Sequence, residues 1–533
     1  MSSPEPPRQT AKTKLSVSTA LVAAGMLLSR LAGFARVTLF SGVFGQQSDA
    51  ADAFTQALKI PNFLQNLLGE GVLSAALIPV YSGLMVTDRD RADRVARATL
   101  GILALITSVV VLLGVIFTPT LVVLVAGGYT GEKRELTIAL VRILFPGVGL
   151  LVMSAWCLAI LNSHHRFFLS YAAPVLWNAA LIAVLVFWPH QDLSTVAIHL
   201  AWATVVGAAL QLTVQLPVVW RLMQGQWTRV GGQVAEHVRR VLTTSLPVVF
   251  TRGVVQVSSF IDGYIATWLG TGAATALGYA QQLYQLPVAL FGMAVSSASL
   301  PSMSAAATTS DPETLRTRIS AGQETIVALV VPSTVAFLAL GDVMIAMLLE
   351  HGKFTHADTL YVWAILAGSA VGLLATTVGR LYSNAFYALR DTRTPTLFAL
   401  IRVVLVAALG YALAIVIPEL VGTERRWGAV GLTVSAGLAG WIEFALLRRA
   451  LRRRIGAVTV SPALIAKTWA CTAPGIALGT ALRWLIPGPF LVLRGLVILG
   501  VFGVLYLSVA QVAGLFDARA LVRRALRSSS PRG

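Results

Sequence analysis

The sequence predicts an all-α membrane protein that crosses the bilayer many times. Of its 533 residues, 56% are hydrophobic and only 12% are charged, whereas an ordinary soluble domain carries about 25% charged residues. The apolar blocks recur without a polar stretch long enough for a soluble domain. They also lack the alternating rhythm of about ten residues that membrane β-strands show. Helices are expected, because backbone groups cannot remain unpaired in lipid.

Fourteen apolar blocks are long enough to span a membrane. A hydrocarbon core about 30 Å thick requires roughly 20 apolar residues per helix. The first two blocks exceed this length and contain charges, so we expect bent or broken helices there. The predicted spans are 16–43, 52–84, 98–126, 136–161, 168–189, 195–222, 238–269, 274–303, 321–349, 359–388, 394–418, 427–450, 464–486 and 490–514.

The basic residues predict which side of the membrane each loop faces. Cytoplasmic loops are enriched in Lys and Arg. The fourteen spans place 27 basic residues on the side that carries both termini and 7 on the other. Both termini are therefore expected in the cytoplasm, with a polar leader at 1–14, no cleavable signal peptide and a basic tail at 515–533. The net charge of +18 is mostly this orientation signal, because no clustered basic face with interleaved aromatics indicates nucleic-acid binding.

Seven basic residues lie more than four positions inside the predicted spans, and those nearer the span ends are counted with the loops. A cation near the bilayer centre costs from about 3 to more than 10 kcal/mol, so it usually faces a wet cavity or an anionic partner. Near a span end the side chain can instead extend to the interface. For Lys59, Arg142 and Arg402, such snorkelling or a local ion pair stays open. The seven residues are Arg30, Arg36, Lys59, Arg142, Arg252, Arg380 and Arg402.

Arg30 and Arg36 share one short segment of the first span, with Gly33 between them. Six residues turn a regular helix through about 600°, so the two side chains would point roughly 120° apart. A break at Gly33 would allow both to reach one cavity. The planar fork of arginine pairs well with phosphate oxygens.

Three acids accompany these cations. Asp52 begins the second span, and Glu70 lies within it between two glycines, which favour a helix that bends around a cavity. An interhelical ion pair is the alternative for Glu70. Asp262, in the seventh span, would either bind a coupling cation or neutralise Arg252, and both remain open.

A weak repeat relates the second and eighth spans. Pro61 and Pro79 in the former correspond to Pro287 and Pro301 in the latter. Six spans separate the two segments, which suggests two six-helix halves and two added helices. Repeated halves that rock about a central site are a common transporter design.

No motif for covalent chemistry is visible. The chain has no Gly-x-x-x-x-Gly-Lys-Ser/Thr nucleotide loop and no aspartate-rich motif of a prenyl-lipid transferase. Cys157 and Cys471 lie far apart in apolar stretches, so neither a disulfide nor a metal cluster is indicated. We expect no enzyme activity, catalytic residue, metal or cofactor, and transport driven by an ion gradient or the membrane potential.

Several of these stretches together resemble the MurJ/MviN lipid II flippases of the multidrug/oligosaccharidyl-lipid/polysaccharide (MOP) superfamily. The resemblance implies two six-helix lobes, 15–223 and 236–451, around a cationic cavity. It also implies a groove for a polyprenyl tail at 464–514. The matching stretches, in family order, are 29–36, 51–54, 59–63, 69–71, Pro79, 352–355, 385–388 and 391–395.

The resemblance also implies the function and the membrane. The expected substrate is the undecaprenyl-pyrophosphate-linked peptidoglycan precursor, moved from the cytoplasmic to the outer leaflet of the bacterial inner membrane by alternating access. The partners would be this anionic lipid, membrane lipid and a coupling cation, with the protein as a monomer. The alternative is a MOP exporter of another polyprenyl-linked polysaccharide or of drugs. A passive channel would not need clustered arginines.

The resemblance assigns substrate-binding roles and also shows departures from the family. Arg30 and Arg36 match the cavity arginines, which look like pyrophosphate-binding groups, and Asp52 and Glu70 match acids of the family. Val37 replaces an acid that often follows the second arginine. Uncharged residues replace charged ones at Gln65, Asn66, Gln281, Gln282 and Gln285.

We hypothesise that Arg252 or Arg380 compensates for these lost charges. Asp262 is the ion-coupling candidate. The substrate-binding candidates are Arg30, Arg36, Asp52, Asn62, Gln65, Glu70, Arg252, Gln282 and Arg380.

Overall fold

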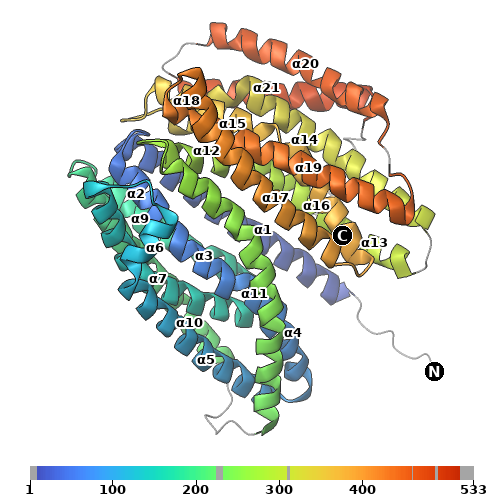
Figure 1. Ribbon diagram of the computed structural model, residues 1–533. Coiled ribbons are helices and arrows are strands. Elements are labelled where there is room, and N and C mark those ends of the chain that lie inside the picture. Colours follow the sequence, from blue (N-terminus) through green and yellow to red (C-terminus); the bar gives the residue numbers. More distant parts are fainter. Residues whose placement is uncertain (1–8, 224–231, 309–311, 459, 487–489, 516–533) are drawn as a thin grey trace.

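The computed structural model describes residues 9–223, 232–308, 312–458, 460–486 and 490–515. Every regular element in these ranges is a helix (Figure 1). Twelve segments of the described chain are long and apolar enough to cross a membrane. The all-α membrane fold class predicted from composition is therefore confirmed.

The first helix bundle corresponds to the first six predicted spans. Small residues allow its helices to approach closely: a Cβ added at Gly114 would lie 2.1 Å from a ring carbon of Phe145. Its helices are α1 (Gln9–Phe44), α2 (Asp49–Ala57), α3 (Lys59–Leu68), α4 (Glu70–Thr87), α5 (Arg89–Ile116), α6 (Thr118–Val125), α7 (Gly131–Ser163), α8 (Phe167–Ala172), α9 (Pro174–Phe187) and α10 (Leu193–Leu222).

In the second bundle, small residues likewise allow the helices to approach closely. A Cβ added at Gly372 would lie 2.4 Å from the Cα of Gly437. The backbone just before Leu373 is therefore nearly in contact with the helix that contains Gly437. Its elements are α11 (Gly232–Ala266), α12 (Ala273–Pro287), η1 (Val288–Met293), α13 (Ala294–Thr308), α14 (Pro312–Leu349), α15 (His356–Ala370), α16 (Leu373–Ala388), α17 (Arg393–Tyr411), η2 (Ala412–Val416), α18 (Ile417–Val421), η3 (Arg425–Trp427) and α19 (Gly428–Ile455).

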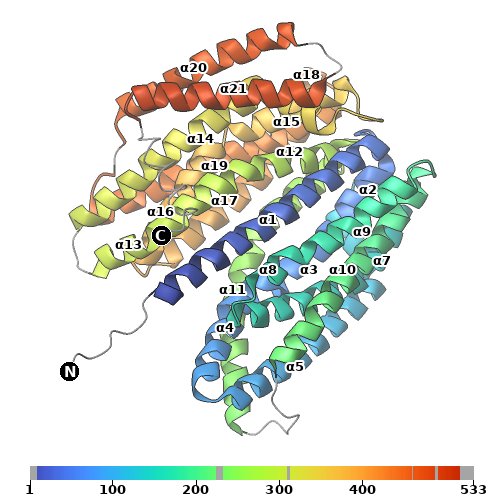
Figure 2. The same cartoon turned by 180° about the vertical axis from the view of Figure 1, so that it is seen from behind.

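Two further helices pack on the outer side of α14. They are α20 (Pro462–Leu485) and α21 (Leu491–Val512), and Figure 2 shows both along one edge of the molecule. α21 is among the twelve candidate spans, whereas α20 and α11, at the predicted spans 464–486 and 238–269, are not. The count of fourteen spans therefore stays a prediction.

α11, the first helix of the second bundle, contacts both bundles. It packs against α3, α4, α5 and α6 of the first bundle and against α12, α17 and α19 of the second. A side chain on this helix can therefore interact with either bundle.

The second predicted span is broken, whereas the first is not. The second consists of α2, α3 and α4, and a Cβ added at Gly69, between α3 and α4, would lie 2.3 Å from the Gln65 carbonyl oxygen. α1 instead continues through Gly33 without interruption. A continuous helix satisfies its own backbone hydrogen bonds, for which lipid offers no replacement. Arg30 and Arg36 consequently stay roughly 120° apart around α1.

The eighth predicted span is interrupted as well. α12 ends at Pro287, the π-helix η1 follows, and α13 contains Pro301. The two spans that carry the proline repeat are thus both irregular. Irregular backbone in a membrane is tolerated where it is buried in protein or lines a cavity.

The two bundles meet at one end of the molecule. There the Thr38 hydroxyl donates to the Leu348 carbonyl over 2.9 Å, and the Lys353 amide donates to the Gly42 carbonyl over 2.8 Å. Both views show the bundles side by side near α2 and α12 and diverging toward α4 and α13 (Figures 1 and 2). The charge pattern predicts that the closed end faces away from the cytoplasm.

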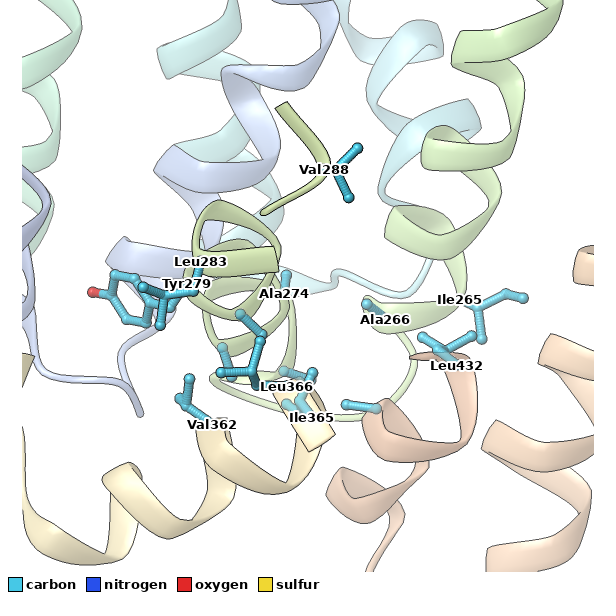
Figure 3. Packing of buried hydrophobic residues seen from close by; sticks show 14 of the residues in the cluster. Ile265, Ala266, Ala274, Tyr279, Leu283, Val288, Val362, Ile365, Leu366 and Leu432 are labelled. Carbon is cyan, nitrogen blue, oxygen red and sulfur yellow. The ribbon is translucent and has the colours of Figure 1, made fainter. Parts of the chain in front are cut away.

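A hydrophobic core anchors α12 in the second bundle close to this contact. Figure 3 shows Tyr279 and Leu283 of α12 beside Val362 and Leu366 of α15. All four side chains are at most 5% exposed. The same helix can therefore transmit a contact made at its end to the rest of the second bundle.

Candidate functional site

Asp52 joins the two bundles at their closed end. It lies in α2, whose N-cap is the side chain of Ser48, and it is fully buried. Its carboxylate accepts four hydrogen bonds: from Lys133 Nζ at 2.8 Å, from the Gly272 amide at 2.7 Å, and from the Thr275 amide and hydroxyl at 2.9 and 2.7 Å. Lys133 belongs to α7 of the first bundle, and the other donors belong to the second.

Asp52 acts as a cap for the start of α12. The N-cap residue of that helix, Gly272, has φ +89° and no side chain, so it cannot satisfy the free amides of the first turn. A carboxylate at a helix N-terminus is also favoured by the helix dipole. Gln46 Nε2 adds a 2.8 Å bond to the Gly272 carbonyl, and the Thr271 hydroxyl adds a 2.7 Å bond to Asp49.

Lys133 is held by more than its two carboxylates. Its ammonium lies 2.9 Å from Asp49 and 4.4 Å from the centroid of the Tyr129 ring. Burial, with Asp52 and Asp49 nearby, raises the pKa of the Tyr129 hydroxyl well above its usual value. The ring therefore remains neutral and attracts the cation through its π face.

Arg36 is engaged by α9 of the same bundle. Its Nε donates to Oδ1 of Asn178 over 3.1 Å, and its guanidinium carbon lies 5.2 Å from the centroid of the Trp177 ring. These contacts use the Nε edge and one face of the guanidinium. No other hydrogen-bond partner of Arg36 occurs among the described residues, and Tyr279 of α12 lies within electrostatic range of it.

Arg30 and the amide side chains that the sequence analysis named differ from Arg36, because they have no hydrogen-bond partner among the described residues. Arg30, Asn62 and Gln281 are exposed, and Gln65 and Gln282 are half-buried. In the part of the chain that the structure describes, none of their side chains makes a hydrogen bond. They are thus available to groups outside the chain.

A second charged group centres on Asp262 of α11. Its Oδ1 is buried and has no hydrogen-bond partner in the described chain. The carboxylate is within electrostatic range of Lys59 and Arg402, which come from different bundles. The Lys59 ammonium lies against Gly263, where an added Cβ would be 2.2 Å from Nζ.

The remaining intramembrane arginines differ in their surroundings. Arg402 of α17 pairs with Glu443 of α19 over 3.1 Å, so the ion-pair alternative describes it. Arg142 is exposed, and so is Arg380 on α16. The side chains of Glu70 and Arg252 lie outside the described residues.

Sequence reasoning missed the partners that give these residues their roles. Asn178 stands alone in the apolar helix 174–187, and an isolated amide of this kind is a usable signal. Thr275, Lys133 and Glu443 carry no signal that links them to Asp52 or Arg402. In the described chain, no group of three His, Cys, Asp or Glu side chains could hold a metal ion, and both cysteines are free.

Comparisons with known proteins agree with this architecture. The family model described as "Lipid II flippase MurJ" matches residues 40–500. The chain is 32% identical over 435 residues to the lipid II flippase MurJ of Burkholderia cenocepacia, covering 80% of this chain and 82% of that protein. It is 30% identical over 437 residues to a probable lipid II flippase MurJ of Rhizobium meliloti, with 80% and 79% covered.

Solved structures show the same fold. A lipid II flippase MurJ in an inward closed conformation aligns with a TM-score of 0.75 at 22% identity, covering 95% of this chain and all of that one. An inward-facing multidrug resistance MATE transporter of the MOP superfamily aligns with a TM-score of 0.64 at 19% identity, with 82% and 99% covered. The architecture is thus shared beyond one transport activity.

Proposed function

Because the chain belongs to the lipid II flippase MurJ family, we propose that it moves lipid II from the cytoplasmic to the outer leaflet of the bacterial inner membrane by alternating access. Lipid II is the undecaprenyl-pyrophosphate-linked precursor of peptidoglycan. No bond is made or broken in such a step, so the chain needs binding groups and two conformations, and no catalytic residue.

The unused terminal fork of Arg36 inside a transmembrane helix is the observation that carries this proposal. An intramembrane cation indicates function, because burying it in lipid without a role is costly. A guanidinium fork matches the oxygens of a pyrophosphate through paired hydrogen bonds. Arg30, Asn62, Gln65 and Gln282 would add donors that are individually weak, which suits a cargo that must be released.

The closed contact at Asp52 supports a state that receives cargo from the cytoplasmic side. The bundles touch where the loops carry few basic residues and diverge toward the opposite end (Figure 1). Outward release would then require the bonds between Asp52 and α12 to break. In this state all the bonding capacity of Asp52 is used within the chain, so its predicted contact with substrate belongs to an opened state.

Asp262 is our candidate for energy coupling. Its unpaired Oδ1 lies on α11, which contacts both bundles. Binding of a proton or a cation there would weaken the electrostatic attraction of Asp262 for Lys59 and Arg402. If Asp262→Asn leaves the dependence of flipping on an ion gradient unchanged in proteoliposomes, this assignment is wrong.

An exporter of drugs or of another lipid-linked saccharide is the second candidate. The MATE transporter fold supports it, but the two intramembrane arginines of α1 favour an anionic cargo. Complementation separates the two: the parent chain should rescue a bacterium depleted of its own lipid II flippase, and Arg30→Ala and Arg36→Ala should not. Failure of the parent, with the protein present in the membrane, favours the exporter.

The topology and oligomeric state complete the proposal. The distribution of 27 and 7 basic residues supports a cytoplasmic location of both termini, and one chain contains both bundles, so a monomer suffices. Single cysteines introduced in the loops and labelled from outside the cell test the topology, since Cys157 and Cys471 are both buried.

A further inference from the structure

The guanidinium of Arg36 is held on one side only. Arginine has five N–H donors, and the one on Nε bonds to Asn178 over 3.1 Å. The four donors on the two terminal nitrogens have no hydrogen-bond partner among the described residues. The group is thus oriented by its Nε edge, while its fork remains unused.

A second hydrogen bond fixes the orientation of the Asn178 amide, so that its oxygen accepts from Arg36. The side chain is 6% exposed, and its Nδ2 donates to the Pro174 carbonyl over 3.2 Å. That bond directs the amide nitrogen along α9 and leaves Oδ1 facing the guanidinium. The opposite orientation of the amide would place two donor groups against each other.

Trp177 supplies the second contact. Its ring lies under the guanidinium at 5.2 Å, within the range of cation–π attraction. Gly207 of α10 keeps this residue in place, because a Cβ there would lie 2.9 Å from the Trp177 Cα. Consecutive residues of one tightly packed helix therefore contact the edge and the face of the same cation.

The partner of Arg36 is neutral. The residue after it is Val37, and no described acid forms an ion pair with it. A carboxylate would hold the guanidinium equally well but would cancel its attraction for a second anion. An amide orients the cation and leaves its charge intact.

We propose that Asn178 and Trp177 are positioning residues, which hold Arg36 so that its terminal fork and full charge face the anionic headgroup of the cargo. This inference rests on the proposed function, because it takes the cargo to be a lipid-linked pyrophosphate.

The test measures lipid II binding to the purified full-length chain in lipid nanodiscs. Asn178→Asp keeps the size and the acceptor but adds a negative charge, and we expect binding at least about tenfold weaker than the parent at pH 7.5. The introduced carboxylate stays ionised at this pH, because an aspartate has an ordinary pKa of about 3.9 and the adjacent guanidinium favours its charged form. Asn178→Ala should lose less, because it removes the acceptor without adding a negative charge.

A second pair of variants tests the face contact independently of that charge. Trp177→Phe keeps an aromatic ring and should bind within about twofold of the parent, whereas Trp177→Leu should bind several-fold more weakly. This pair decides the question if Asn178→Asp fails to fold.

The outcomes separate this inference from the proposed function. If the parent binds no lipid II, the function is wrong. If the parent binds, Arg36→Ala does not, and Asn178→Asp matches the parent at pH 7.5, the function stands and the positioning role is overturned. Equal binding by Trp177→Leu and Trp177→Phe would also contradict it.

Discussion

Polar side chains are buried and hydrogen-bonded at the contact between the bundles, whereas several on the helices that diverge from it are exposed and make no hydrogen bond to described residues. At the contact, Asp52 is fully buried and accepts four hydrogen bonds. Away from it, Arg30, Asn62 and Gln281 are exposed, and no described residue bonds to their side chains. Satisfied buried groups stabilise one arrangement of helices, whereas unsatisfied groups are free for a ligand. The difference separates residues that hold a conformation from residues that would contact cargo.

The largest expected effect comes from removing the centre of the contact. Asp52→Ala leaves the Lys133 ammonium, 12% exposed, with Asp49 as its only carboxylate partner and leaves the first turn of α12 uncapped. Breaking a buried ion pair costs about 3–5 kcal/mol, so the closed arrangement should lose most of its population. A cysteine introduced by Gln46→Cys, at a position 2% exposed in the parent, should then react much faster with an impermeant maleimide.

Asp49→Ala is the matched control for that experiment. Its side chain is 60% exposed and contacts the same lysine, and exposed ion pairs contribute at most about 1 kcal/mol. Equal labelling of the Asp52 and Asp49 variants would show that burial at the contact does not control opening.

A smaller effect is expected from the arginines that we hypothesise to replace lost family charges. Arg252→Ala and Arg380→Ala should each weaken lipid II binding about tenfold, the equivalent of one hydrogen bond to a charged group. Arg142→Ala, another exposed arginine of a predicted span, should leave binding unchanged. Variants at positions 252 and 380 that support cell-wall synthesis as well as the parent would contradict the hypothesis.

Substitutions at two glycines of one loop can distinguish the cost of backbone strain from the cost of disturbing the contact between the bundles. Gly270 and Gly272 have φ +99° and +89°, a region that costs other residues about 1–2 kcal/mol. A Cβ at Gly272 would also lie 2.3 Å from the Gln46 side chain, whereas one at Gly270 has no atom within 4 Å. Gly272→Ala should therefore lower the melting temperature more than Gly270→Ala, and equal shifts would mean that Gln46 yields without cost.

The smallest effects should occur at the exposed amides. Asn62→Ala and Gln281→Ala should change stability by no more than about 0.5 kcal/mol, as for ordinary surface substitutions. Each should weaken lipid II binding roughly threefold, because a neutral hydrogen bond is lost. Melting curves measure the stability of each variant, and binding isotherms of the same preparations measure its affinity for lipid II. A large loss of stability would place these amides with the contact rather than with the cargo.

The candidate site was predictable only in part. Arg30 and Arg36 attract notice because charge is rare in an apolar span, and their spacing predicts the angle between them on a continuous helix. The resemblance to the family grouped Asp52 with the substrate-binding residues, and the structure shows it at the contact with α12. Its bonds to Thr275 join residues 223 positions apart, and no pattern in either segment refers to the other.

The sequence by itself determined that the chain is a multi-spanning helical membrane protein, because hydrophobic length and backbone hydrogen bonding are local properties that lipid enforces helix by helix. Its motifs also determined the family. Only the tertiary structure decided which polar groups are satisfied. Arg36 meets Asn178, 142 residues away, and Asp52 meets the start of α12 because two bundles pack in one arrangement. That arrangement depends on close contacts between distant helices, so it decides which residues hold the molecule closed and which remain free for cargo.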